Sequence, residues 1–271
     1  MIAEPMIVTT SLREIAVDVA AAERVAHELA IPFVIRNRQS MQELTQKHKV
    51  TLIIVMKNQQ PIVTNAAGKF FFHRGLSELR ILNLLRTGND PLVKSLALAP
   101  GMSILDCTLG LAADALVAAH IVGATGMVCG LESSPLVSLI TRWGIAALTD
   151  DAADCRPELR QAVRRIEVIT TDHANYLAQL PDGCFDVLYF DPMFRRPKQS
   201  SAGIQSLRDH ANPQPLHRES LQQALRVARS RVVVKELSGS AEFNRLGIRR
   251  FGGGQHSSVQ YGILHKGDEL A

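Results

Sequence analysis

The sequence predicts an α/β fold in which helices cover both faces of a mostly parallel sheet. Short runs rich in β-branched and apolar residues alternate with helical stretches from residue 103 onward, a pattern typical of parallel sheets. The chain has 271 residues, of which 46% are hydrophobic and 21% charged, and this composition suits a large buried core rather than a disordered chain. We therefore expect one α/β domain with a smaller preceding region.

Five strands and four helices can be placed along the second part of the chain. Strands are expected at 103–107, 126–131, 166–170, 185–190 and 231–236. Helices are expected at 111–122, 135–148, from 156 onward and at 216–228. Pro157 favours a helix start there, because a proline in the first turn loses no hydrogen bond that the helix needs.

The end of the chain breaks this alternation. Two further strands, at 248–251 and 258–264, are separated by Gly252, Gly253 and Gly254, with no helix long enough for a normal crossover. A short glycine-rich connection favours an antiparallel hairpin. The sheet is therefore expected to end in such a hairpin.

The first hundred residues form a different region. Helices are expected at about 17–30 and 41–48, and strands at 32–35, 51–56, 61–64 and 69–73. This mixture indicates a small α+β cap over residues 1–75. A helical connection is expected over residues 76–100, and the main domain over residues 101–271.

The modest net charge of +4 is unevenly distributed. Residues 1–99 carry a net charge of +4, residues 100–191 carry −7, and residues 192–271 carry +7. An acidic middle suits a cationic small ligand, and basic flanks suit a polyanion. Chance fluctuation of charge along the chain is the alternative.

Several classes of protein are excluded by what the sequence lacks. No apolar run approaches the roughly 20 residues of a membrane span, and the first residues lack the basic stretch and apolar run of a signal peptide. The four cysteines form no Cys-x-x-Cys pair, and no histidines stand at metal-ligand spacing. We expect a soluble, cytoplasmic protein without a metal or a membrane partner.

The carboxyl ends of the first two predicted strands carry residues that suit a nucleoside ligand. In open parallel sheets, ligands bind beyond these ends. Asp106 ends the first strand, and Gly110 permits a tight turn and a close approach of ligand to backbone. Glu132 ends the second strand and can accept both hydroxyl hydrogens of a ribose. No Gly-x-Gly-x-x-Gly is present, which disfavours a dehydrogenase.

The segment after the fourth strand, Asp191-Pro192-Met193-Phe194, points to an amine substrate. The carboxylate of Asp191 and the carbonyl of Pro192 are adjacent acceptors that can hold both hydrogens of an exocyclic amine. Phe194 offers a face on which a base can stack, worth about 1–3 kcal/mol per base in nucleic-acid complexes. Such a site would present the amine nitrogen to an electrophilic methyl group, with Asp191, Pro192 and Phe194 as catalytic residues.

Together these segments resemble the class I S-adenosyl-L-methionine (SAM)-dependent methyltransferases. Those enzymes have a doubly wound, Rossmann-like, seven-stranded sheet with an antiparallel last strand, and Asp191–Phe194 resembles their Asp/Asn-Pro-Pro-Tyr/Phe motif. More narrowly, five segments resemble the small-subunit ribosomal RNA guanine-N2 methyltransferase family, type J. They are His73–Gly75, Asp106–Asp114, Glu132–Pro135, Asp191–Phe194 and Arg231–Lys235.

This resemblance implies SAM as the cofactor and guanine N2 of ribosomal RNA as the methyl acceptor. Asp106 or Asp114 would lie near the ammonium group of SAM, Glu132 at its ribose, and Asp172 and His173 at its adenine. Arg195, Arg196 and Lys198 follow the motif and would meet RNA phosphates. The predicted cofactor-binding residues are Asp106, Gly110, Ala113, Asp114, Glu132, Ser133, Asp172, His173 and Asp191.

Other interpretations stay open at this point. The same fold could methylate a protein side chain or a small amine, or bind RNA without turnover. Asp106 could be a helix N-cap, and Glu132 an ordinary carboxylate at a helix N-terminus. His173 could be a helix-start residue, and the arginines after Phe194 could belong to a solvated loop.

Overall fold

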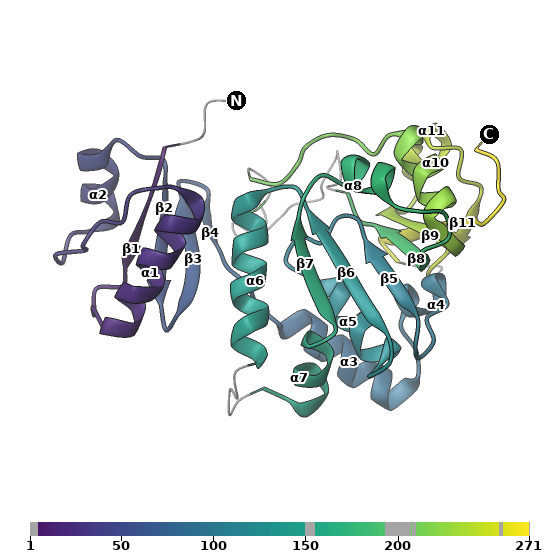
Figure 1. Ribbon diagram of the computed structural model, residues 1–271, viewed down its shortest axis with the longest axis horizontal. Helices are drawn as coiled ribbons and strands as arrows, with labels where there is room; N and C mark the ends of the chain where they lie inside the picture. Colours follow the sequence, from purple (N-terminus) through teal and green to yellow (C-terminus); the bar gives the residue numbers. More distant parts are fainter. Residues whose placement is uncertain (1–4, 150–154, 193–206, 208–209, 255–256, 271) are drawn as a thin grey trace.

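The computed structural model describes residues 5–149, 155–192, 207, 210–254 and 257–270. Over this part of the chain it contains a four-stranded sheet from residues 6–70 and a seven-stranded sheet from residues 103–265. The small sheet lies beside one long helix of the larger unit (Figure 1). The domain boundaries at residues 75 and 100 stay predictions.

The small sheet has the order β1-β2-β3-β4. Strands β1 and β2 pair in parallel, and β3 and β4 follow as antiparallel strands. Helix α1 (Ala16–Leu29) packs on one face and α2 (Met41–His48) on the other. Successive side chains of β2 point to opposite faces, so that alternate residues join the hydrophobic cluster with α1 and the others join the cluster with α2. The strands are β1 (Met6–Thr10), β2 (Leu52–Lys57), β3 (Gln60–Asn65) and β4 (Gly68–Phe70).

One strand prediction in this region is wrong, one strand is shorter than predicted, and one strand was missed. Residues 32–35 make only an isolated bridge between Phe33 and Val8, because the two residues after Arg36 turn into the left-handed region and end the extended path. The strand expected at 69–73 ends at Phe70. Strand β1 was not predicted, although its side chains are buried from Ile7 onward.

The large sheet has the order β10-β11-β9-β8-β5-β6-β7. Five central strands are parallel, and β11 (Val259–His265) runs antiparallel to both β9 and β10 (Arg250–Gly252). The predicted C-terminal hairpin and antiparallel last strand are therefore confirmed. The parallel strands are β5 (Ser103–Asp106), β6 (Met127–Glu132), β7 (Ile166–Thr170), β8 (Phe185–Phe190) and β9 (Ala228–Leu237).

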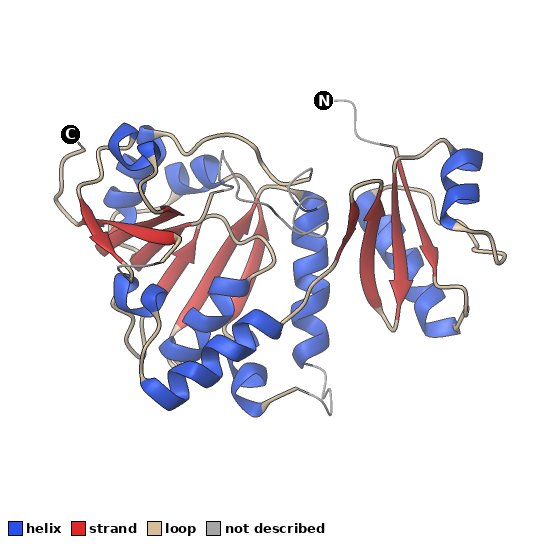
Figure 2. Ribbon diagram, turned by 180° about the vertical axis from the view of Figure 1, so that it is seen from behind, coloured by secondary structure: helices blue, strands red, loops and turns tan. Residues whose placement is uncertain are grey.

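Helices cover both faces of this sheet, as Figure 2 shows from behind. One buried cluster joins α3, α5 and α7 to one face, and a second joins α8, α10 and α11 to the other. No helix in the described ranges is long and apolar enough to cross a membrane. The helices are α3 (Gly75–Thr87), α4 (Pro91–Leu96), α5 (Ala113–Val122), α6 (Pro135–Thr149), α7 (Pro157–Val163), α8 (His173–Gln179), α10 (Arg218–Val227) and α11 (Ala241–Arg245).

The predicted helical connection consists of two helices, α3 and α4. Gly88 adopts a left-handed conformation with φ of 66° and ends α3. Asp90 then caps α4 by accepting hydrogen bonds from the backbone N–H groups of Leu92 and Val93, with Pro91 at the first helical position.

Helix α6 is shared by the two sheets. Its apolar residues Leu136, Val137, Leu139 and Ile140 belong to the core of the small sheet, whereas its later residues reach the core of the large one. Gly144 lets the cap approach closely, since a Cβ atom there would lie 2.0 Å from the Phe72 side chain. The small sheet is thus packed directly against the larger unit.

Candidate active site

A pocket of about 630 Å³ lies at the carboxyl ends of β5, β6 and β8. Its volume is in the usual range for small-molecule sites. Part of its wall comes from the cap, namely Lys69, Phe70, Phe71 and His73. The structure brings nine of the predicted site residues together in its lining: Asp106, Gly110, Ala113, Asp114, Glu132, Ser133, His173, Asp191 and Pro192.

The loop after β5 is bonded to both neighbouring strands. The backbone N–H of Cys107 donates to the carbonyl of Tyr189 on β8, and that of Leu109 donates to Leu131 on β6. Gly130 makes room for this loop, because a Cβ there would lie 2.5 Å from the Leu109 side chain. The loop therefore has one defined path over the strand ends.

Glu132 supports the turn at Gly110, which has a left-handed φ of 53°. One carboxylate oxygen accepts the Gly110 N–H at 3.0 Å, and the other accepts that of Ser134 at 2.8 Å. Burial raises the pKa of Glu132, while these backbone donors oppose the rise. The backbone N–H of Ser133 also acts on this carboxylate. A carboxylate has about four acceptor sites in all, so Glu132 can support the loop and still accept a hydrogen bond from a diol.

Asp106 is buried and has no ion-pair partner among the described residues. Its carboxylate accepts the Thr108 N–H at 3.0 Å. Burial raises the pKa of Asp106 to about 8, and the charges of Asp114 and Asp191 add to this rise. The helix-cap interpretation of Asp106 is wrong, because α5 begins at Ala113 and is preceded by Ala112 without a side-chain cap.

Asp114, in contrast to Asp106, is surrounded by hydrogen-bond donors, two of which are cations. Its carboxylate accepts hydrogen bonds from Arg80 at 2.5 Å, from the Tyr189 hydroxyl at 2.7 Å and from Lys235 at 2.9 Å. Burial alone would raise its pKa, but Lys235 and Arg80 outweigh burial and lower the pKa to about 2. Of the two carboxylates proposed for an ammonium group, Asp106 is thus the one that forms no ion pair with the described part of the chain.

Asp191 directly follows β8 and is fixed at two points. Its backbone N–H donates to the Thr108 hydroxyl at 2.5 Å, and its Oδ2 accepts from Lys235 Nζ at 2.7 Å. Burial raises the pKa of Asp191 to about 6, whereas Lys235 favours the ionised form. Pro192 lines the pocket beside it.

The two residues expected at adenine take different positions. Asp172 caps α8, accepting the N–H groups of Ala174 at 2.9 Å and Asn175 at 3.4 Å. His173 is the first residue of α8, as the helix-start interpretation had it, and also lines the pocket. Its ring meets Phe190 edge to face at 5.5 Å, and burial lowers its pKa. It is therefore neutral at pH 7.

Four predicted residues lie outside the described ranges: Phe194, Arg195, Arg196 and Lys198. In the ranges that are described, no group of three or more histidines, cysteines or carboxylates could hold a metal ion.

Three functional side chains were not assigned from the sequence. Lys235 had a signal, since a lysine directly after the buried run Val232–Val234 is unusual for an apolar strand. Arg80 and Tyr189 had none, because an arginine on a helix and a tyrosine in a buried strand are ordinary residues. Only the fold shows that all three reach Asp114 or Asp191.

The strand order and the pocket define a class I, Rossmann-like methyltransferase. The solved structure of a SAM-dependent methyltransferase from Neisseria gonorrhoeae superposes with a TM-score of 0.64 over 97% of each chain, at 16% identity. The family described as "Putative SAM-dependent methyltransferase" matches residues 27–245. The chain belongs to this family, and its cofactor is SAM.

Relatives with similar sequences include an uncharacterized protein and ribosomal RNA methyltransferases. The uncharacterized protein YpiP of Bacillus subtilis is 37% identical over 241 residues, which cover 89% of this chain and 92% of YpiP. Ribosomal RNA small subunit methyltransferase J of Hydrogenovibrio crunogenus is 32% identical over 155 residues, 54% of this chain and 52% of that protein. Ribosomal RNA small subunit methyltransferase J of Cellvibrio japonicus is 37% identical over 116 residues, which cover 42% of each chain. The chain thus aligns with about half the length of these type J enzymes.

Proposed function

We propose that this methyltransferase acts on an exocyclic amine, namely guanine N2 of small-subunit ribosomal RNA. The observation that carries the proposal is the position of Asp191 and Pro192, which line the same pocket as the loop around Gly110. Lys235 bonds Oδ2 of Asp191, so that Oδ1, which bonds no other side chain in the described ranges, can accept an amine hydrogen. The Pro192 carbonyl is the second acceptor.

The residues on the other side of the pocket fit SAM. Asp106 has a buried carboxylate that forms no ion pair with any described residue, which suits the ammonium group, and Glu132 suits the ribose diol. Backbone groups around Gly110 would hold the methionine end. Asp172 and His173 would contact the adenine, with His173 as a flat pocket wall. SAM supplies a methyl group on a positively charged sulfur.

The protein residues would act mainly by positioning. Asp191 and Pro192 hold both amine hydrogens, which directs the nitrogen lone pair away from them and toward the methyl group. Alignment of reacting atoms near 3 Å accounts for a large share of such rate enhancement. No strong base is needed first, because the alkylated nitrogen becomes acidic and then releases its proton. Phe194 would stack on a flipped or single-stranded guanine.

The RNA substrate rests on two supports. The type J relatives are named as ribosomal RNA methyltransferases. The basic segment that starts after the Asp191 motif, with Arg195, Arg196 and Lys198, suits phosphate contacts. A ribosomal RNA substrate would place the enzyme in the cytoplasm.

The decisive experiment is methyl transfer from tritiated SAM to ribosomal RNA from a strain that lacks the gene. We expect the label in one methylated guanine. Mass spectrometry of nucleosides should find that same methylated guanine missing from the ribosomal RNA of the strain. The variant Asp191→Ala should bind SAM but transfer no label. Label in a protein or a small amine instead of RNA would overturn the RNA substrate but retain the amine chemistry. Retained transfer by a folded Asp191→Ala variant would overturn the catalytic site.

A further inference from the structure

Lys235 connects two carboxylates of the pocket. Strands β8 and β9 run in parallel with Phe190 beside Val234, which sets Lys235 next to Asp191. Its ammonium nitrogen lies 2.7 Å from Asp191 Oδ2 and 2.9 Å from Asp114 Oδ2. One cation therefore joins the proposed acceptor of the amine to the first turn of α5.

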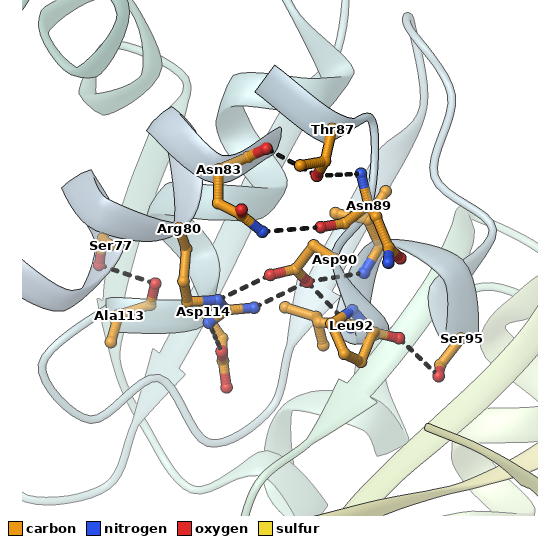
Figure 3. Close-up of polar contacts among 12 residues, drawn as sticks. Ser77, Arg80, Asn83, Thr87, Asn89, Asp90, Leu92, Ser95, Ala113 and Asp114 are labelled. Atoms are coloured by element: carbon orange, nitrogen blue, oxygen red, sulfur yellow. Dashed lines mark hydrogen bonds and ion pairs between the residues drawn. The ribbon is translucent and has the colours of Figure 1, made fainter. Parts of the chain in front are cut away.

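The Asp114 end of this connection is anchored by other elements. Arg80 donates to Asp114 from α3, and its guanidinium also donates two hydrogen bonds of 2.9 Å each to the carboxylate of Asp90 (Figure 3). The Tyr189 hydroxyl donates to the second oxygen of Asp114 from β8. Ion pairs therefore run from the cap of α4 through Arg80, Asp114 and Lys235 to Asp191.

The charges around Asp191 make Lys235 important for the protonation of that carboxylate. The groups that act on it are Lys235 and Glu236 of β9, together with Asp114 of α5. Asp106 of β5 also lies close enough to Asp191 for the charge of Asp191 to raise the pKa of Asp106. Lys235 is thus the one cation among these described groups. Without it, a proton would bind Asp191 more readily, and a protonated carboxyl group could donate where the amine needs an acceptor.

We propose that Lys235 is a positioning residue for methyl transfer: it orients the Asp191 carboxylate from the anchored Asp114 and maintains it as a hydrogen-bond acceptor. This inference rests on the proposed role of Asp191 toward an amine substrate. It assigns no contact with SAM to Lys235.

The first test compares Lys235→Met and Lys235→Arg with the wild type. Methionine retains most of the side-chain volume but removes the cation that lies between Asp114 and Asp191, so that Asp114 retains Arg80 as its ion-pair partner. We expect Lys235→Met to lower kcat roughly 100-fold at pH 7, as a misplaced reacting group does. The loss should shrink as the pH rises and Asp191 ionises. Lys235→Arg should recover part of the activity, and SAM should bind to all three proteins.

A matched control is Lys94→Met, which removes an exposed lysine from α4 and should leave kcat and its pH profile unchanged. Wild-type kcat in Lys235→Met would overturn the proposal. An equal loss of kcat at every pH would also overturn it, because that result indicates only a structural role.

A second measurement does not depend on turnover. Carbon-13 NMR of labelled aspartates, with Asp191→Asn to assign the signal, follows the ionisation of Asp191 directly. We expect Asp191 to titrate at higher pH in Lys235→Met than in the wild type, and an unchanged titration would refute the proposal. If the wild type binds SAM but methylates no amine, the proposed function fails, and this titration alone decides the role of Lys235.

Discussion

Asp106 and Asp114 line the same pocket, but their surroundings drive their ionisation in opposite directions. Burial raises the pKa of Asp106 to about 8 although the charge of Lys235 opposes the rise, whereas Lys235 and Arg80 bond Asp114 directly, overcome burial and lower its pKa to about 2. The two carboxylates stand eight residues apart on either side of one loop. This difference makes Asp106 the proposed partner of a ligand cation and Asp114 an anchor within the protein.

Asp106→Asn is expected to stabilise the free protein at alkaline pH. An acid whose pKa is raised on folding loses stability as the pH rises from its unfolded value, about 4, to its folded value, here about 8. The amide removes that loss. Thermal unfolding at pH 5 and pH 8 should therefore show a gain in Tm mainly at pH 8. The same variant should bind SAM more weakly in calorimetry, and tighter binding would contradict the assigned role.

Asp114→Asn should destabilise the protein strongly. It leaves the buried charges of Lys235 and Arg80 without their shared partner, and loss of one member of a buried ion pair typically lowers the free energy of unfolding by about 3–5 kcal/mol. Urea unfolding at pH 7 measures this change. Because the folded pKa is lowered, the wild-type advantage should fade as the pH falls from about 4 toward 2. An advantage that persisted at the lowest pH would contradict the ion-pair explanation.

Gly130→Ala should disturb the cofactor loop from the neighbouring strand. The added Cβ would lie 2.5 Å from Leu109, and overpacking of this kind usually lowers stability by about 1–3 kcal/mol. SAM affinity should fall as well, because Leu109 precedes Gly110. Gly75→Ala is the control, since no atom lies within 4 Å of its new Cβ. In the double variant Gly130→Ala/Leu109→Ala, the shorter side chain at position 109 removes the overlap, and part of the SAM affinity should return.

Gly144→Ala should loosen the contact between the cap and α6. Its Cβ would overlap Phe72, whose ring packs between the cores of the two sheets. Limited proteolysis should cut the connection around residue 72 faster in the variant than in the wild type. If the cap adds to substrate binding, KM should rise more than kcat falls. Unchanged proteolysis would show that Phe72 moves aside without effect on the cap.

The parallel core was predictable because its elements are locally encoded. The strand at 185–190 is largely buried and mostly apolar, the strand at 166–170 is rich in β-branched residues, and the residues that follow such strands mark the pocket. The cap was less predictable. Strand β1 is short, and the run at 32–35 resembles a strand but makes only one bridge. Whether a short apolar run becomes a strand depends on the neighbouring strand with which it pairs, and the sequence pattern of the run does not show that neighbour.

The sequence by itself determined the class of the protein: strand ends at Asp106, Glu132 and Asp191 fall at the edge where a parallel sheet binds ligands. Only the tertiary structure decided what each carboxylate does there. Asp114 is satisfied by Arg80 and Lys235, which are distant in sequence, whereas Asp106 meets no protein cation among the described residues. The reason is physical: ionisation of a buried carboxylate depends on the charges within a few ångströms of it, and folding brings those charges from α3 and β9.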